Sequence, residues 1–165
     1  MFVLGIDPGL TRCGYGCLEW RGPNKVKAIS AGVLRTDHND ELPKRLAMLH
    51  VEVTELISEF APSVLAIERV LFQVNVSTAM SVGHASGVIM AAGANAGCEV
   101  RQYSPNEIKL AVTGYGNADK QQVERMVRAQ LKLETELKPV DAADAIAVAL
   151  CHTAIEGVPS MSVQV

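Results

Sequence analysis

Alternating runs of apolar and polar residues predict a series of short strands. Five apolar runs have the length and composition of strands, and turn-forming residues separate them. They cover residues 2–6, 14–20, 26–34, 64–67 and 99–103. Short turns join the first three runs, which predicts an antiparallel meander. The fourth run follows a helical segment, and this order favours a parallel crossover.

Apolar residues at helical spacing predict the remaining elements. The clearest helix covers residues 42–60, with Asn39 or Asp40 as its expected N-cap. Ser104, Pro105 and Glu107 form the start signal of another helix. The predicted helices cover residues 42–60, 74–96, 105–112, about 119–131 and 141–155. This order predicts an α/β fold whose five-stranded mixed sheet, an antiparallel meander plus parallel strands, is flanked by helices.

The segment 70–97 contains no Asp, Glu, Lys or Arg. It carries too many Ser, Thr, Asn and Gln residues for a membrane helix, so it predicts a helix buried on most sides. Ala79, Gly83 and Gly87 fall four residues apart and would let another backbone approach closely. We expect a two-fold subunit interface along these three residues. Packing inside a single chain is the alternative.

Four acids stand in apolar surroundings: Asp7, Glu68, Asp141 and Asp144. Asp7 and Glu68 each end an apolar strand, where sites form at the carboxyl edge of a sheet. An isolated buried charge is costly, and no basic residue adjoins Asp7 or Asp144 in sequence, so a bound cation is the economical partner. Magnesium prefers carboxylate oxygens. Two such ions about 4 Å apart are the equipment of phosphodiester hydrolysis.

Two other interpretations of these acids are open. Asp141 and Asp144 could serve as the N-cap and third residue of the last helix, where the helix dipole favours acids. A strand followed by Asp7 and Gly9 also opens the phosphate loops of actin-like ATPases. Those proteins need two such domains around one nucleotide, and this chain has the length of one.

Basic and aromatic residues near the acids are candidates for nucleic-acid contacts. Lys109 and Lys120 flank the polar loop 113–117, and Arg69 follows Glu68 directly. Each could bind a phosphate beside the metal ions, although a solvated side chain is the simpler interpretation of any one of them. Phe72 could wedge against unstacked bases, or it could belong to the core.

Size and composition add a few limits. The 165 residues predict one domain at 1–156, followed by a flexible tail at 157–165. The net charge of −3 says little about DNA, because bound cations would offset acids gathered in a metal site. The four cysteines lack zinc-site spacing and are expected to be buried free thiols. Without a signal peptide before the first strand, we expect a cytoplasmic protein.

The motifs that carry these residues resemble one family. The chain contains G-I-D-P-G at 5–9, G-Y-G at 14–16, A-I-E at 66–68 and D-A-A-D-A at 141–145. Together with residues 114–123, these motifs are similar, in collinear order from about residue 1 to 153, to the RuvC family of Holliday-junction resolvases. The resemblance implies an RNase H-like fold and a homodimer. It also implies symmetric nicking of two opposing strands of a four-way DNA junction during recombination and repair.

The resemblance also assigns roles. It implies Asp7, Glu68, Asp141 and Asp144 as catalytic acids that hold magnesium or manganese, with two ions per site. Lys109 and Lys120 match the family's DNA-contacting positions, and we add Arg69, Phe72 and Asn75 as expected contacts. A branch-migration helicase complex is the implied partner.

Two positions depart from the family pattern. Cys13 stands where Thr is common, and Leu71 stands where an aromatic is often found, with Phe72 next. One alternative function is an RNase H-like nuclease acting on structured RNA. Another is a non-catalytic junction-binding scaffold, but such a scaffold would gain nothing from four acids facing phosphates.

Overall fold

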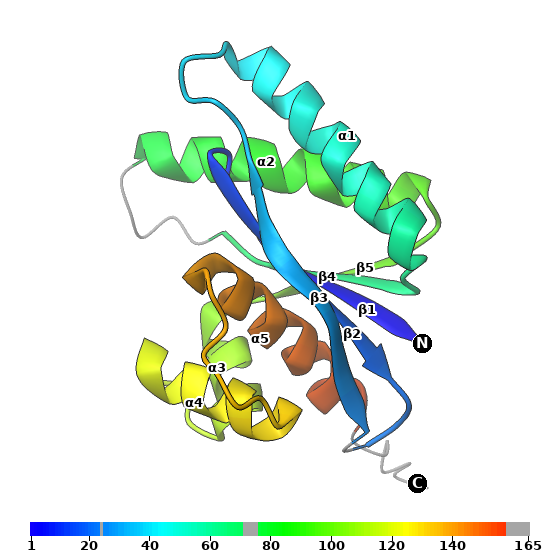
Figure 1. The fold of residues 1–165 in the computed structure, drawn as a ribbon. Coiled ribbons are helices and arrows are strands. Elements are labelled where there is room, and N and C mark those ends of the chain that lie inside the picture. Colours follow the sequence, from blue (N-terminus) through cyan, green and yellow to red (C-terminus); the bar gives the residue numbers. More distant parts are fainter. Residues whose placement is uncertain (24, 71–75, 158–165) are drawn as a thin grey trace, which may run out of the picture.

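A computed structural model describes residues 1–23, 25–70 and 76–157 (Figure 1). The strands are β1 (Phe2–Asp7), β2 (Arg12–Trp20), β3 (Val26–Arg35), β4 (Val64–Glu68) and β5 (Glu99–Tyr103). The helices are α1 (Leu42–Phe60), α2 (Val76–Asn95), α3 (Pro105–Thr113), α4 (Lys120–Leu131) and α5 (Val140–Glu156).

One five-stranded mixed sheet organises these elements, in the order β3-β2-β1-β4-β5. The pairs β1–β2 and β2–β3 are antiparallel, whereas β1–β4 and β4–β5 are parallel. The predicted meander and crossover are therefore confirmed. β2 begins at Arg12, two residues earlier than expected, because Arg12 and Cys13 still pair with Arg35 and Leu34 of β3.

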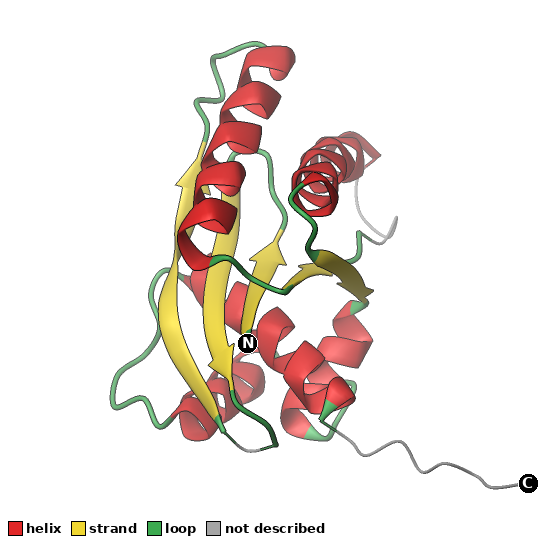
Figure 2. Cartoon of the chain, turned by 90° about the vertical axis from the view of Figure 1, so that its right-hand side faces the viewer, coloured by secondary structure: helices red, strands yellow, loops and turns green. Residues whose placement is uncertain are grey.

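Helices cover both faces of the sheet (Figure 2). Figure 1 shows α1 and α2 on one face and α3, α4 and α5 on the other. Alternate residues of each strand point to opposite faces, so the strands supply two separate cores. Leu4 and Ile6 of β1 pack with the residues of α1 and α2, while Val3 packs with those of α3, α4 and α5. Both faces of the central strands are buried, which explains their nearly continuous apolar sequence.

Helix α5 lies directly against the backbone of β1 and β2. A Cβ atom added at Gly5 would stand 2.2 Å from the carbonyl oxygen of Ala145, and one added at Gly14 would stand 2.0 Å from that of Asp141. Neither position has room for a side chain. These two glycines therefore fix how closely the first turns of α5 approach the ends of the strands.

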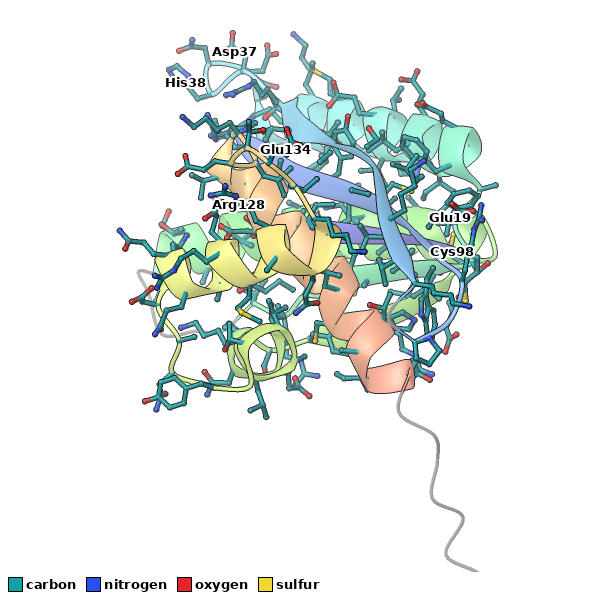
Figure 3. The ribbon with its side chains drawn as sticks, turned by 60° about the horizontal axis from the view of Figure 1, so that its bottom comes forward. Glu19, Asp37, His38, Cys98, Arg128 and Glu134 are labelled. Atoms are coloured by element: carbon teal, nitrogen blue, oxygen red, sulfur yellow. The ribbon has the colours of Figure 1, made fainter. Side chains whose placement is uncertain are left out.

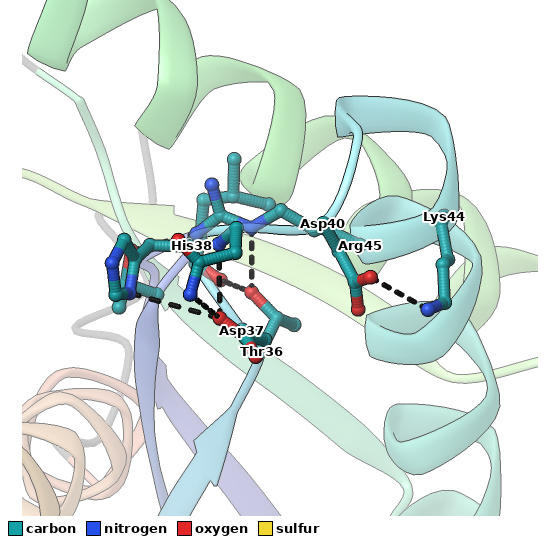
Figure 4. Close-up of polar contacts among 9 residues, drawn as sticks. Thr36, Asp37, His38, Asp40, Lys44 and Arg45 are labelled. Atoms are coloured by element: carbon teal, nitrogen blue, oxygen red, sulfur yellow. Dashed lines mark hydrogen bonds and ion pairs between the residues drawn. The ribbon is translucent and has the colours of Figure 1, made fainter.

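Side-chain bonds anchor the turn between β1 and β2 to the corner between β3 and α1 (Figure 4). Arg45 of α1 donates from Nε to Thr36 Oγ1 at 2.9 Å and from Nη2 to Thr11 Oγ1 at 2.7 Å. Thr36 Oγ1 donates in turn to the carbonyl oxygen of Leu10 at 2.6 Å. The turn that leads from Asp7 into β2 is thus held from the side.

The starts of two helices were predicted from capping residues, and one of these predictions is corrected. Glu41, not Asn39 or Asp40, is the N-cap of α1, and its side chain makes no capping bond. The capping box of Ser104 and Glu107 is confirmed at the start of α3. Among the described residues, no helix combines the length and the apolar character needed to cross a membrane.

Candidate active site

Two neighbouring parallel strands place Asp7 and Glu68 side by side. Each is the last residue of its strand, β1 and β4, one step beyond the paired residues Ile6 and Ile67. Asp7 lies four residues after Val3 and Glu68 lies two residues after Ala66, and residues an even number apart in a strand share a face. Val3 and Ala66 belong to the core beside α5, so both acids lie on the face that α5 covers. Two half-buried carboxylates therefore share one corner of the sheet.

The first turns of α5 bring the other two acids to the same corner. Asp141 and Asp144 are three residues apart in the helix and share a face. Pro139 is the N-cap of α5, and its start has no side-chain capping bond. Asp141 lies inside the first turn, so the interpretation of this pair as capping residues is wrong.

A pocket of about 320 Å³ opens between these elements. Three of the four predicted acids line it, namely Asp7, Glu68 and Asp144, together with Lys109 and Lys120. Its apolar wall consists of Pro105, Ile108, Val123 and Ala147. Asp141 is not among the lining residues, but its charge still acts on Asp7.

Basic side chains pair with the two helix acids. Arg12 donates to Asp141 Oδ2 from Nε at 2.9 Å and from Nη2 at 2.5 Å. Lys120 Nζ lies 3.3 Å from Asp144 Oδ2. No basic residue adjoins Asp144 in the sequence, but the fold brings Lys120 to it from 24 residues away. Asp144 therefore has a basic partner in the folded protein.

The strand acids lie among other negative charges, which Lys109 and Lys120 offset only in part. Burial, followed by repulsion from Glu68, Asp144 and Asp141, raises the pKa of Asp7 from 3.8 to about 7. Burial and the charge of Asp144 likewise raise the pKa of Glu68. The pKa of Lys120 is raised, mainly because of Asp144. A positive charge between the carboxylates would relieve this repulsion.

These residues fit a divalent ion by their chemistry. Their donors are carboxylate oxygens, which hard cations such as magnesium prefer. As the side chains stand, no three Asp, Glu, His or Cys residues of the described ranges converge closely enough to hold one ion. Arg12 and Lys120 each contact one oxygen, Oδ2, of Asp141 and Asp144, so an ion that takes the helix acids as ligands must displace these basic partners or share the carboxylates with them.

The other predicted contact residues are distributed around this pocket. Lys109 and Lys120 line it, and Arg69 is exposed directly after Glu68. Leu71, Phe72 and Asn75 lie outside the described residues.

On α2 the predicted interface residues separate. Gly83 and Gly87 are exposed, and a Cβ added to either would meet nothing within 4 Å. Ala79 is only 5% exposed, so its place in a subunit interface is corrected to a place inside the chain. The reason is that α2 packs on α1 and the sheet, which covers part of the strip of small residues.

Arg12 was missed by reasoning from the sequence alone. Its position close to Asp7 in sequence gave no indication of its partner Asp141, which lies 129 residues away. Placing the start of β2 at residue 14 left Arg12 in a loop, where it had no predicted partner.

Comparison with known proteins agrees with this geometry. The sequence model of the family described as "Crossover junction endodeoxyribonuclease RuvC" matches residues 3–152. The RuvC of Salinispora arenicola is 51% identical, covering 92% of this chain and 87% of that protein. The RuvC of Natranaerobius thermophilus is 45% identical, covering 93% and 94%.

Solved structures show the same architecture. The structure of T. thermophilus RuvC in complex with a Holliday junction substrate has a TM-score of 0.90 and 34% sequence identity, and 95% of each chain is covered. The yeast mitochondrial Holliday junction resolvase Ydc2 has a TM-score of 0.65 at 18% identity, covering 92% of this chain and 78% of that one. The predicted RNase H-like fold is confirmed. The chain belongs to the RuvC family of crossover junction endodeoxyribonucleases.

Proposed function

We propose that this chain resolves Holliday junctions by hydrolysing one phosphodiester bond in each of two opposing strands. The observation that carries the proposal is the pocket in which Asp7, Glu68 and Asp144 meet two lysines. Acids and bases in one open pocket suit a phosphate that is bound through metal ions on one side and through ammonium groups on the other.

Asp7, Glu68, Asp141 and Asp144 are the proposed catalytic metal ligands. RuvC nucleases depend on metal ions, and we infer magnesium, with manganese as a substitute and two ions per site. The bound ions would supply an activated water and stabilise the charge that develops on the phosphate oxygens. Lys109 and Lys120 would hold the phosphate, and Arg69 would contact the neighbouring backbone.

The apolar wall of the pocket supports this assignment. Ile108, Val123 and Ala147 line the pocket with apolar groups that offer no hydrogen bonds to water. In such a site, charges act more strongly on the substrate than they would in bulk water. The lysines would therefore position the scissile bond rather than merely attract DNA.

A homodimer is the second part of the proposal. The described helix α2 contains no charged residue and exposes Val76, Met80, Gly83 and Gly87 on one stretch. A two-fold axis along this surface would give the enzyme the same symmetry as its four-way substrate. Two sites could then cut opposing strands in one complex.

Met80→Glu should convert the dimer to a monomer. Met80 is 56% exposed on α2, so a carboxylate there would be buried without a partner in the proposed interface. Sedimentation should give a mass near 17.6 kDa for the variant and twice that for the wild type. Met126→Glu on α4, where the side chain is 38% exposed, is the control and should stay dimeric. A wild-type monomer would argue against the interface.

Other parts of the assignment follow from the family. We propose one nuclease domain at residues 1–156, action in the cytoplasm and cooperation with a branch-migration helicase complex. The predicted tail lies, from residue 158 on, outside the described residues. Holliday-junction resolution places the protein in DNA recombination and repair.

Cleavage of a synthetic mobile junction tests the function. With magnesium, we expect symmetric nicks in two opposing strands of the junction and no cutting of a linear duplex of the same sequence. A four-way junction made of RNA with the matching sequence should remain intact, and so should other structured RNA. Tight junction binding without nicks in magnesium or manganese would indicate a scaffold, and faster cleavage of RNA would indicate an RNase H-like ribonuclease.

A further inference from the structure

The ion pair of Arg12 and Asp141 joins the first residue of β2 to the first turn of α5. Both donors of Arg12, Nε and Nη2, bond the same oxygen, Oδ2, at 2.9 Å and 2.5 Å. The two side chains are 41% and 29% exposed. A guanidinium that donates twice to one carboxylate forms a stronger pair than a single ammonium contact.

The fold itself holds this pair in register. Gly14, two residues after Arg12, contacts the backbone of Asp141 so closely that no side chain fits between them. On the other side of Arg12, Thr11 accepts a bond from Arg45, and its carbonyl oxygen accepts one from the Thr36 amide at 3.3 Å. Backbone contacts on both sides therefore deliver Arg12 to Asp141.

The four acids fall into two classes by their partners. Asp141 and Asp144 of α5 each have a basic partner. No basic nitrogen of the described residues lies within ion-pair distance of Asp7 or Glu68. The strand acids are thus open to a cation, while the helix acids are already neutralised by the protein.

The two basic partners differ in how firmly they hold. Lys120 is 80% exposed and reaches Asp144 with one contact of 3.3 Å. Arg12 is half as exposed and makes two shorter bonds. A divalent ion that gains Asp141 as a ligand must displace Arg12 or accept its positive charge nearby, and either outcome weakens ion binding.

We propose that Arg12 is a built-in counter-ion that competes with the divalent metal for Asp141. The inference rests on the proposed function, since it takes Asp141 as a metal ligand. Arg12 neutralises Asp141 in the metal-free protein, and metal binding replaces its two hydrogen bonds. Arg12 is therefore a residue that sets the affinity for metal, not a catalytic residue.

Direct binding of Mn²⁺ to the intact protein without DNA tests this inference. In Arg12→Gln, which lacks the charge, the dissociation constant should fall roughly three- to tenfold below that of the wild type, the range expected for removing a partly exposed pair. Free Mn²⁺ can be followed by its paramagnetic resonance signal. Unfolding curves of both proteins confirm that the variant is folded.

Arg21→Gln is the matched control. Arg21 donates from Nε to Glu19 Oε1 at 2.8 Å, and its Nη2 lies 2.7 Å from the same oxygen, so a similarly close ion pair stands at the other end of β2. Glu19 and the loop containing Asp37 and His38 lie at opposite ends of the sheet (Figure 3). The affinity of Arg21→Gln for Mn²⁺ should equal that of the wild type.

A double variant tests whether Arg12 acts through its pair with Asp141 or only through its positive charge near the metal ions. Asp141→Asn removes the carboxylate for which Arg12 and the ion compete. Adding Arg12→Gln to it should change the Mn²⁺ dissociation constant much less than in the wild type. A full tightening in that background would show that Arg12 acts at a distance, and the proposed competition would be overturned.

The outcomes distinguish this inference from the proposed function. If the wild type binds Mn²⁺, Asp7→Asn does not, and Arg12→Gln binds equally or more weakly, Arg12 is no competitor although the metal site stands. If Asp7→Asn binds as well as the wild type, the metal site itself is wrong. If neither the wild type nor Arg12→Gln binds, releasing Asp141 does not open the site, which also overturns the inference.

Discussion

Replacing Asp7 with asparagine should reduce junction nicking by roughly 10³-fold or more while junction binding persists. Asp7 lies at the centre of the acid group, because the charges of Glu68, Asp144 and Asp141 all act on it. An amide keeps the shape of the side chain but removes the negative charge that a divalent ion needs. Loss of an interaction that stabilises the transition state lowers the rate without a matching loss of affinity.

Single-turnover nicking of a labelled junction, with binding measured in calcium, checks this expectation. Asp40→Asn is the control, since Asp40 pairs with Lys44 at 2.6 Å in the corner between β3 and α1. It should nick at the wild-type rate. Glu68→Gln should repeat the loss seen for Asp7→Asn. Nicking by Asp7→Asn within tenfold of the wild-type rate would contradict the assignment of the acids.

Asp7→Asn should also make the metal-free protein more stable at pH 8. The pKa of Asp7 is about 7 in the folded protein, against the ordinary aspartate value of 3.8 in the unfolded chain. Between these values the unfolded state has released its proton and the folded state has not, so rising pH favours unfolding. The penalty grows from about pH 4, is complete above pH 7, and is absent in the variant.

A shift of this size corresponds to at most about 4 kcal/mol. The pocket is open to solvent, so we expect a gain of about 2 kcal/mol at pH 8 and no gain at pH 4. Urea unfolding in the presence of a chelator measures the difference. Magnesium should then reverse the order, because an ion that binds only the folded wild type stabilises only that protein. Equal stabilities at pH 8 without metal would mean that Asp7 carries no such penalty.

Much of the fold and the places of Asp7 and Glu68 in the pocket followed from local sequence. Asp7 and Glu68 end short apolar runs, and strand ends of parallel neighbours meet at one edge of a sheet. Ser104 and Glu107 carry their capping signal within four residues. In each case the information lies within a few positions of the residue concerned.

The partners of the helix acids did not follow from the sequence. Arg12 and Asp141 are 129 residues apart, and only the close contact of Gly14 with α5 brings them together. The burial of Ala79 likewise depends on how α2 packs against the rest of the chain. The spacing of small residues along α2 does not predict this packing. Long-range pairing is the part that residue patterns left undetermined.

The packing of α5 across β1 has a consequence for biosynthesis. The first strand supplies Asp7, but the helix that faces it begins only at Val140, near the end of the chain. A ribosome must therefore release almost the whole polypeptide before the acids can meet, since contacts so distant in sequence form late. A nascent or truncated chain lacks Asp141 and Asp144 and carries no complete nuclease site. The order of the elements thus delays assembly of the proposed site until the chain is nearly finished.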